Sequence, residues 1–299
     1  MGVSAAEVRA KINEPSVFRS VQRRLFNYAG WGLCALTFLM LGGAMVWILE
    51  MVFVRGAGAI NWSVLSTVTL GVGGGLLNAI EGTLVLALGG LILSVPPGIA
   101  AGIYLSEYEG GWLAPLLRFM SDVLVGVPSI VVGYFGYVTM VVGLGWQFST
   151  AAGSIALAII SVPYITRTSE VAFRGVPRTL REAGFGLGCT PGTVIMRICM
   201  PMAMPSILTG VLLALAISVG ETAPLIYTAG WSTYMWTGHL TQEPIGYLTY
   251  AIWSFITQPF ATAHQLAYAA ALLVTLFVLI ISVIARIVTY RRSGWGQHA

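Results

Sequence analysis

Long apolar runs alternate with short polar segments along this chain of 299 residues. An α-helix needs about 20 apolar residues to cross a hydrocarbon layer of roughly 30 Å. The runs predict six spanning helices, at about residues 28–50, 82–105, 123–143, 151–168, 207–229 and 266–288. The pattern therefore predicts an all-α, polytopic membrane protein whose transmembrane domain covers residues 28–292. Between the last two spans, residues 248–257 are expected to form a short helix along the outer surface.

Proline interrupts four consecutive predicted spans. Pro96, Pro128, Pro163 and Pro224 lie in the second, third, fourth and fifth spans respectively. Proline removes a backbone hydrogen bond that lipid cannot replace, so such sites need a neighbouring helix or a cavity. Packing between helices would account for any single site, whereas four together favour a bundle with a polar path through it.

Composition excludes several classes of protein. Hydrophobic residues make up 57% of the chain and charged residues 9%, against about 45–50% and 25% in soluble domains. Disordered chains, nucleic-acid-binding modules and ordinary soluble enzymes are thereby excluded. The basic excess is small, 15 Lys and Arg against 11 Asp and Glu. The lipid bilayer is therefore the expected partner, and nucleic acid is not.

The basic residues are unevenly divided between the two faces that six spans would create. With both termini on one face, that face receives every Lys and Arg except Arg55, fourteen of fifteen. Because basic residues accumulate on the cytoplasmic side, we expect a multi-pass membrane protein with both termini in the cytoplasm. Residues 1–27 would form a cytoplasmic arm and residues 293–299 a tail. The arm lacks the apolar core of a cleavable signal, so the first span is expected to be retained.

Residues for catalysis or metal binding form no recognisable pattern. Lys11 is the only lysine, so the chain has no phosphate-binding loop of the G-x-x-x-x-G-K-[ST] type. The histidines, His239, His264 and His298, fit no metal-binding or catalytic motif. We therefore predict a non-catalytic chain without a cofactor or metal. If nucleotide hydrolysis drives this protein, another chain must carry it out.

The connection between the fourth and fifth spans, about residues 169–206, carries helix signals of its own. Pro177 suits the first turn of a helix, and Gly188 suits its end. Thr190 followed by Pro191 is a second capping and start signal. Two short helices joined by a turn would form a rigid projection on the cytoplasmic side. An exposed helix with an apolar face is suited to a groove on a partner protein.

The same connection carries a family motif. Residues Glu182-Ala-Gly-Phe-Gly-Leu-Gly188, then nine residues, then Ile198-Cys-Met-Pro201 resemble the E-A-A-x3-G-x9-I-x-L-P signature of ABC-importer permeases. Gly184 replaces the second alanine and Met200 the leucine. The resemblance implies that this coupling segment docks on an ATP-binding subunit. The residues assigned to this contact are Glu182, Ala183, Gly184, Gly188, Ile198 and Pro201, together with Arg178 and Arg181, which the bias of basic residues toward the cytoplasm explains equally well.

Further segments resemble the PstA-type permeases of phosphate-specific ABC importers. They are residues 73–83, 102–108, 127–133, 163–170 and 220–225. The resemblance implies the type I ABC importer permease fold, with a core at about 77–288, and transport of inorganic phosphate across the bacterial cytoplasmic membrane. It also implies three kinds of protein partner: a homologous second permease, a cassette ATPase dimer and an external phosphate-binding protein. One position departs from the family, which usually has an arginine where this chain has Ile217.

Four residues are candidates for the translocation path. Glu221 is expected in the outer half of the membrane, where a carboxylate is costly and usually functional. Because it would repel phosphate, we expect it to pair with an arginine of the partner permease or to gate the path; a carboxylate reaching water is the alternative. Ser129 and Thr222 offer hydroxyl groups beside helix breaks, or bond within their own helices. Arg167 either contacts the anion or reaches toward the cytoplasm.

Other functions remain open on the sequence alone. Another oxyanion, such as sulfate or molybdate, is possible within the importer class. A secondary transporter would work without ATP, and an intramembrane enzyme would need a catalytic group that no motif reveals.

Overall fold

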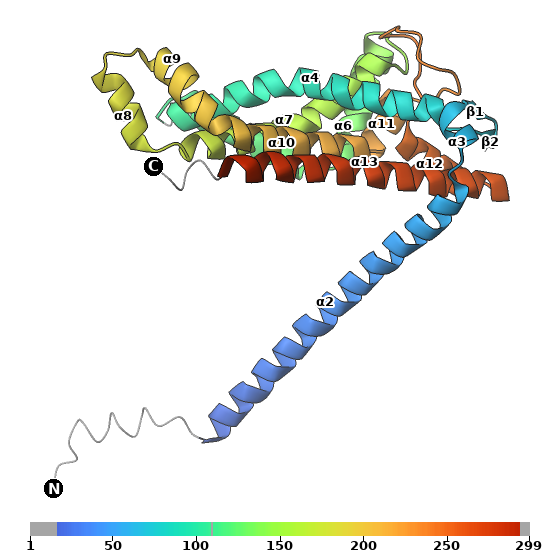
Figure 1. Cartoon of the computed structure of the whole chain (residues 1–299), viewed down its shortest axis with the longest axis horizontal. Helices are drawn as coiled ribbons and strands as arrows, with labels where there is room; N and C mark the ends of the chain where they lie inside the picture. Colours follow the sequence, from blue (N-terminus) through green and yellow to red (C-terminus); the bar gives the residue numbers. More distant parts are fainter. Residues whose placement is uncertain (1–16, 109, 294–299) are drawn as a thin grey trace. The chain divides into compact units, whose positions relative to one another are not determined.

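The structure is a computed structural model of the chain (Figure 1), in which residues 17–108 and 110–293 are described. Most of the expected N-terminal arm and nearly all of the expected tail lie outside these residues. The chain divides after Val54 into two compact units. Within the first, the described residues belong to the long helix α2 (Val17–Ala59). Many of its large apolar side chains are exposed, as expected of a helix that faces lipid or another protein.

Five described helices are long and apolar enough to cross a membrane. They are α2, α4 (Leu77–Glu107), α7 (Thr150–Arg174), the continuous helix Pro191–Gly220, and α13 (Ala261–Ser293). A bent pair supplies the sixth span, because α5 (Leu113–Gly126) meets the helical segment Ser129–Gly143 at 100°. That segment consists of α6 (Ser129–Gly136) and the π-helix η1 (Tyr137–Gly143). The prediction of an all-α, polytopic fold with six spans is confirmed.

The helices α4, α7, α10 (Met200–Gly220) and α13 lie side by side in the second unit (Figure 1). Glycine lets α4 approach α7 closely. A Cβ on Gly98 would lie 2.8 Å from Ile165 Cβ, and a Cβ on Gly90 would lie 2.8 Å from Leu157 Cβ. Small residues at such contacts allow close van der Waals packing between membrane helices. This packing explains why α7 is the most deeply buried of the five helices.

The four proline sites behave in two different ways. The helix α4 continues through Pro96, and α7 continues through Pro163. By contrast, the chain breaks at Pro128, between α5 and α6, and at residues 221–222, ahead of α11 (Ala223–Thr228). Packing therefore suffices at the first two sites. The interrupted backbone that a polar path requires is found at the other two.

A small hairpin and a long loop close one end of the bundle (Figure 1). After α3 (Trp62–Ser66), β1 (Thr69–Leu70) pairs antiparallel with β2 (Gly73–Gly74). The Asn78 side chain on α4 accepts a hydrogen bond from the Thr69 backbone N–H at 3.1 Å and donates one to the Ser232 carbonyl at 2.8 Å. It thus joins the hairpin to the loop. The loop runs from the end of α11 to α12 (Leu248–Ile256), which is the short helix expected at residues 248–257.

Candidate functional site

Two short helices project from the end of the bundle opposite the hairpin (Figure 1). The first, α8 (Arg178–Gly186), begins after Pro177, and α9 covers Pro191–Val194. Between them Gly188 has a positive φ of 77°, which glycine adopts at little cost. The predicted pair of helices is confirmed. One feature differs, since α9 continues through the π-helix η2 (Ile195–Cys199) into α10 without a break.

Within this coupling segment, Gly184 lies where α8 contacts the returning chain. A Cβ at this position would lie 2.7 Å from Ile198 Cδ1 and 3.1 Å from Val194 Cγ2. Glycine at this motif position therefore allows α8 to pack closely against η2. Four other motif residues are exposed: Glu182, Ala183, Gly188 and Pro201.

Arg181 connects α8 to the bundle through an ion pair and a hydrogen bond. Its Nη1 lies 2.9 Å from Glu107 Oε1 at the end of α4, and its Nη2 donates to the Phe173 carbonyl. Both charged side chains are largely buried, 19% exposed for Arg181 and 15% for Glu107. Arg178, one turn earlier, is exposed. The two arginines assigned to the ATPase contact thus lie in different settings, one at the surface and one in an internal ion pair.

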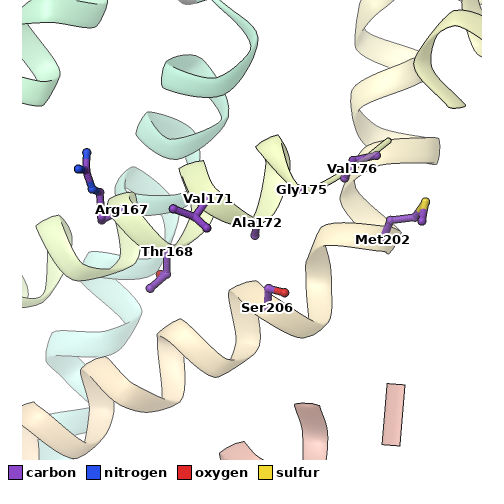
Figure 2. Close-up of a pocket in the computed structure, with 8 residues that line it drawn as sticks. All are labelled: Arg167, Thr168, Val171, Ala172, Gly175, Val176, Met202 and Ser206. Carbon is purple, nitrogen blue, oxygen red and sulfur yellow. The ribbon is translucent and has the colours of Figure 1, made fainter. Parts of the chain in front are cut away.

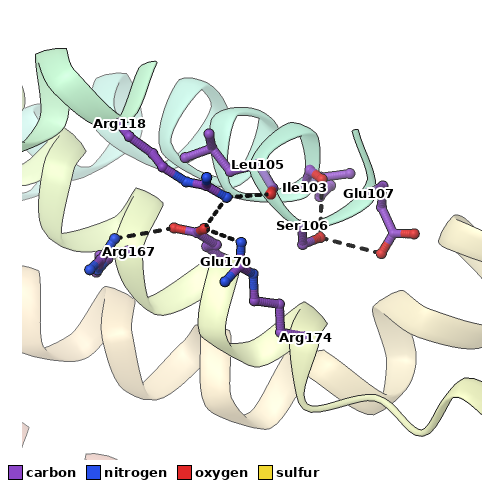
Figure 3. A network of polar contacts seen from close by, with 8 residues as sticks. All are labelled: Ile103, Leu105, Ser106, Glu107, Arg118, Arg167, Glu170 and Arg174. Carbon is purple, nitrogen blue, oxygen red and sulfur yellow. Dashed lines mark hydrogen bonds and ion pairs between the residues drawn. The ribbon is translucent and has the colours of Figure 1, made fainter. Parts of the chain in front are cut away.

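A second polar cluster joins α5 to the end of α7 (Figure 3). Glu170, whose side chain is 3% exposed, lies 2.9 Å from Arg174 Nη2 and 3.2 Å from Arg118 Nη2. Its other carboxylate oxygen lies 3.5 Å from Arg167 Nη1. Three arginines therefore share one buried carboxylate. Arg167, a candidate for the translocation path, already has an acidic partner on its own helix.

A cavity of about 400 Å³ lies beside Arg167, between α7 and α10. Thr168 and Ser206 contribute hydroxyl groups from the two facing helices (Figure 2). The Arg167 guanidinium extends away from Ser206 in this view, and its ion-pair partner is Glu170. The cavity is otherwise lined largely by apolar side chains and glycine. The polar groups of the cavity are therefore two hydroxyl groups and the side chain of Arg167, which is paired with Glu170.

The other three path candidates meet at the two helix breaks. Ser129 is the first residue of α6, and Glu221 and Thr222 separate α10 from α11. The Ser129 side chain lies near the Glu221 carboxyl group. The helices themselves touch, because a Cβ on Gly133 would lie 2.5 Å from Pro224 Cα. No ion pair within residues 17–108 and 110–293 includes Glu221.

Arg167 is separated from this group along the bundle. The hydroxyl groups of Ser161 on α7 and Ser218 on α10 lie 3.0 Å apart and fix the register of the two helices. Arg167 is six residues from this contact in one direction, and Glu221 is three residues from it in the other. At 1.5 Å per residue the two levels differ by roughly 13 Å. The path candidates thus form one group of three, with Arg167 apart.

Comparison with known proteins decides the family. Residues 98–294 match the model of the binding-protein-dependent transport system inner membrane component. The chain belongs to this family. It is 44% identical over 275 residues to the phosphate transport system permease protein PstA 2 of Mycobacterium tuberculosis, covering 92% of this chain and 91% of that protein. PstA of Yersinia pestis is 42% identical, with 83% and 85% covered. The predicted PstA-type resemblance of this permease is confirmed.

Solved structures show the same fold at low sequence identity. A chain from an inward-facing structure of the MetNI methionine ABC transporter superposes with a TM-score of 0.58 at 19% identity, over 72% of this chain and 96% of that one. A bacterial ABC transporter that imports alginate gives a TM-score of 0.59 at 15% identity, over 92% and 99%. The permease therefore has the type I ABC importer fold.

Two acidic residues in the ion pairs of this permease were not among the sequence candidates. Glu107 and Glu170 each hold a buried ion pair near the coupling segment. A signal for Glu170 was present, because Arg167 and Arg174 stand three positions before it and four after it, on the same helix face. Glu107 gave no comparable signal, since its partner Arg181 is 74 residues away in the chain.

Proposed function

We propose that this permease is the translocation subunit of an ATP-driven importer of inorganic phosphate. The observation that carries the proposal is 44% identity, over 92% of the chain, to a phosphate transport system permease. A separate cassette ATPase dimer would supply the energy, in keeping with the absence of a phosphate-binding loop from this sequence. A homologous second permease and an external phosphate-binding protein would complete the assembly.

In this proposal the end of the bundle bearing α8 and α9 faces the cytoplasm, as do both termini. The distribution of basic residues supports this orientation. The exposed residues of α8, Glu182 and Ala183 among them, would enter a groove on the ATPase. The buried ion pair of Arg181 and Glu107 would then transmit movement of α8 to α4, because Arg181 Nη1 and Glu107 Oε1 lie only 2.9 Å apart.

The path for the anion would run past the two helix breaks. Broken helices leave backbone N–H groups free, and Ser129 and Thr222 add hydroxyl donors there. Glu221 would repel phosphate if left alone. Since this chain has Ile217 where the family usually has arginine, we infer that a cation of the second permease pairs with Glu221 and offsets its charge.

The role of Glu221 is tested with the variant Glu221→Gln in the complete transporter. Loss of the carboxylate charge should lower ATP-driven phosphate uptake by at least about tenfold, the effect of losing one strong charged interaction. Assembly with the partner subunits, measured by size-exclusion chromatography, should not change. Glu243→Gln, in the outer loop, is the matched control and should keep normal uptake. Normal uptake by Glu221→Gln would remove the assignment.

A second candidate function within the same class is import of a different oxyanion, which Ile217 favours because a cation is missing from its usual place. Competition distinguishes the two. Unlabelled phosphate should suppress uptake of labelled phosphate, whereas sulfate and molybdate should have little effect. Suppression by sulfate or molybdate in preference to phosphate would support the second candidate instead.

A further inference from the structure

A separate cavity lies beneath α8, at its junction with the bundle. Its volume is about 570 Å³, within the range of about 300–1,000 Å³ for small-molecule sites. Three helices contribute to its wall. Ser106 and Glu107 come from the end of α4, Arg174 from the end of α7, and Arg178 and Arg181 from the first turns of α8. The site thus lies between the coupling segment and the helices that it would move.

Of the described residues that line this cavity, three are arginines and one is a glutamate. Glu107 pairs with Arg181, and Glu170 is shared by Arg174 and two further arginines. Among the described residues Arg178 forms no ion pair. Within the described part of the chain, the cavity wall thus combines three guanidinium groups with one carboxylate, and the guanidinium of Arg178 is paired with none.

The chemistry of these donors restricts the ligand. Guanidinium groups form paired, charge-assisted hydrogen bonds with the oxygens of phosphate groups. The positive end of the α8 dipole lies in the same turns as Arg178 and Arg181 and favours an anion further. A cation would be repelled, and an uncharged molecule would leave the guanidinium charges uncompensated.

We propose that this cavity is a cytosolic binding site for a phosphate group, distinct from the translocation path, that restrains the coupling segment. A phosphate held by Arg174, Arg178 and Arg181 would cross-link α8 to α7 and, through Glu107, to α4. It would favour the position of α8 seen in this structure, because a ligand stabilises the state that it binds best. Binding of phosphate at this site would slow import when phosphate accumulates in the cytosol, an inference that rests on the proposed function.

The test uses the complete transporter in lipid nanodiscs, without the external binding protein and without ATP. Inorganic phosphate should slow amide hydrogen exchange in α8, measured by mass spectrometry. Arg178→Gln should weaken this effect by about tenfold in phosphate concentration, as expected for one lost charged hydrogen bond. Arg197→Gln removes the same charge from the coupling segment but lies outside the cavity, and should keep the full effect. Equal protection in wild type and Arg178→Gln would overturn the proposal.

The phosphate group could come from free phosphate or from an anionic lipid headgroup, and the lipid composition separates these sources. Nanodiscs of phosphatidylcholine alone should show protection by added phosphate. Protection that requires phosphatidylglycerol and is lost in Arg178→Gln would assign the site to a headgroup. Absence of protection under both conditions would refute the site.

Regulation is measured in proteoliposomes loaded internally with phosphate, with each variant compared to its own uptake without internal phosphate. Internal phosphate should reduce uptake by wild type and Arg197→Gln several-fold more than by Arg178→Gln. Equal sensitivity of all three would refute the regulatory role. The binding test fails or succeeds independently of the proposed function, since hydrogen exchange in α8 requires no transport.

Discussion

At the scale of single residues, Glu170 is the charge that connects α5 to α7. It is buried, yet three arginines that are partly exposed surround it. A buried carboxylate is tolerated only when paired and hydrogen-bonded. The sequence shows two of its partners, which lie on the same helix face, but Arg118 is 52 residues away. Such a contact follows from the tertiary fold, so local spacing could not predict it.

The variant Glu170→Gln should destabilise the permease by about 1–3 kcal/mol. This is below the 3–5 kcal/mol of a fully buried pair, because water screens the exposed arginines. Thermal unfolding of the purified transporter measures the change. Arg167→Gln removes the most exposed partner and should cost less than about 1 kcal/mol. Equal stability of wild type and Glu170→Gln would show that the cluster does not hold α5 to α7.

At the scale of helices, the sequence predicted the number of spans better than their geometry. Five of the six apolar runs correspond to a helix or to the bent pair, because bilayer thickness imposes a minimum length. The span predicted at 207–229 lies too far along the chain, since the spanning helix covers Pro191–Gly220 and the apolar run continues across the break into α11. The 100° bend between α5 and α6 was not predicted, since Pro128 indicates a break without fixing its angle. The helices also extend beyond the apolar runs, as α4 does to reach Glu107. Polar residues at those ends are satisfied by contacts that hydrophobicity does not reveal.

Two glycines test helix packing at this scale. A Cβ on Gly102 of α4 would collide with Ser169 Cβ and lie 2.8 Å from the Thr166 carbonyl on α7. Because a backbone carbonyl cannot easily move, Gly102→Ala should cost about 1–3 kcal/mol. Gly184→Ala meets the mobile tip of Ile198, and alanine favours the helix by about 1 kcal/mol. Its stability should therefore stay within about 1 kcal/mol of wild type. Thermal unfolding compares them, and a larger loss in Gly184→Ala would contradict the packing described.

At the scale of the whole molecule, an even number of spans places both termini on one side of the membrane. The proposed orientation predicts that a cytoplasm-active reporter fused after Ala299 is active in cells. The same reporter inserted at residues 238–239, in the long outer loop, should be inactive. Activity in the loop fusion and inactivity at the C-terminus would reverse the orientation and move α8 to the outside.

At this scale, the fold could be predicted from the sequence more completely than the candidate translocation path. Hydrophobicity, basic residues and the coupling motif sufficed to predict the fold and the projecting helices. The path candidates were less evident, because Ser129 and Glu221 come together only through the meeting of α6 and α11. Any cation that pairs with Glu221 would belong to another chain under the proposed function. Under that proposal the site would be complete only in the assembly.

The most direct test of the central claim is uptake of labelled phosphate into proteoliposomes. The permease should be inactive when reconstituted alone. Uptake should appear when the second permease, the cassette ATPase and the phosphate-binding protein are present with ATP, and it should stop when ATP is replaced by a non-hydrolysable analogue. Phosphate uptake by this chain alone, without ATP, would contradict its role as one subunit of an ATP-driven importer.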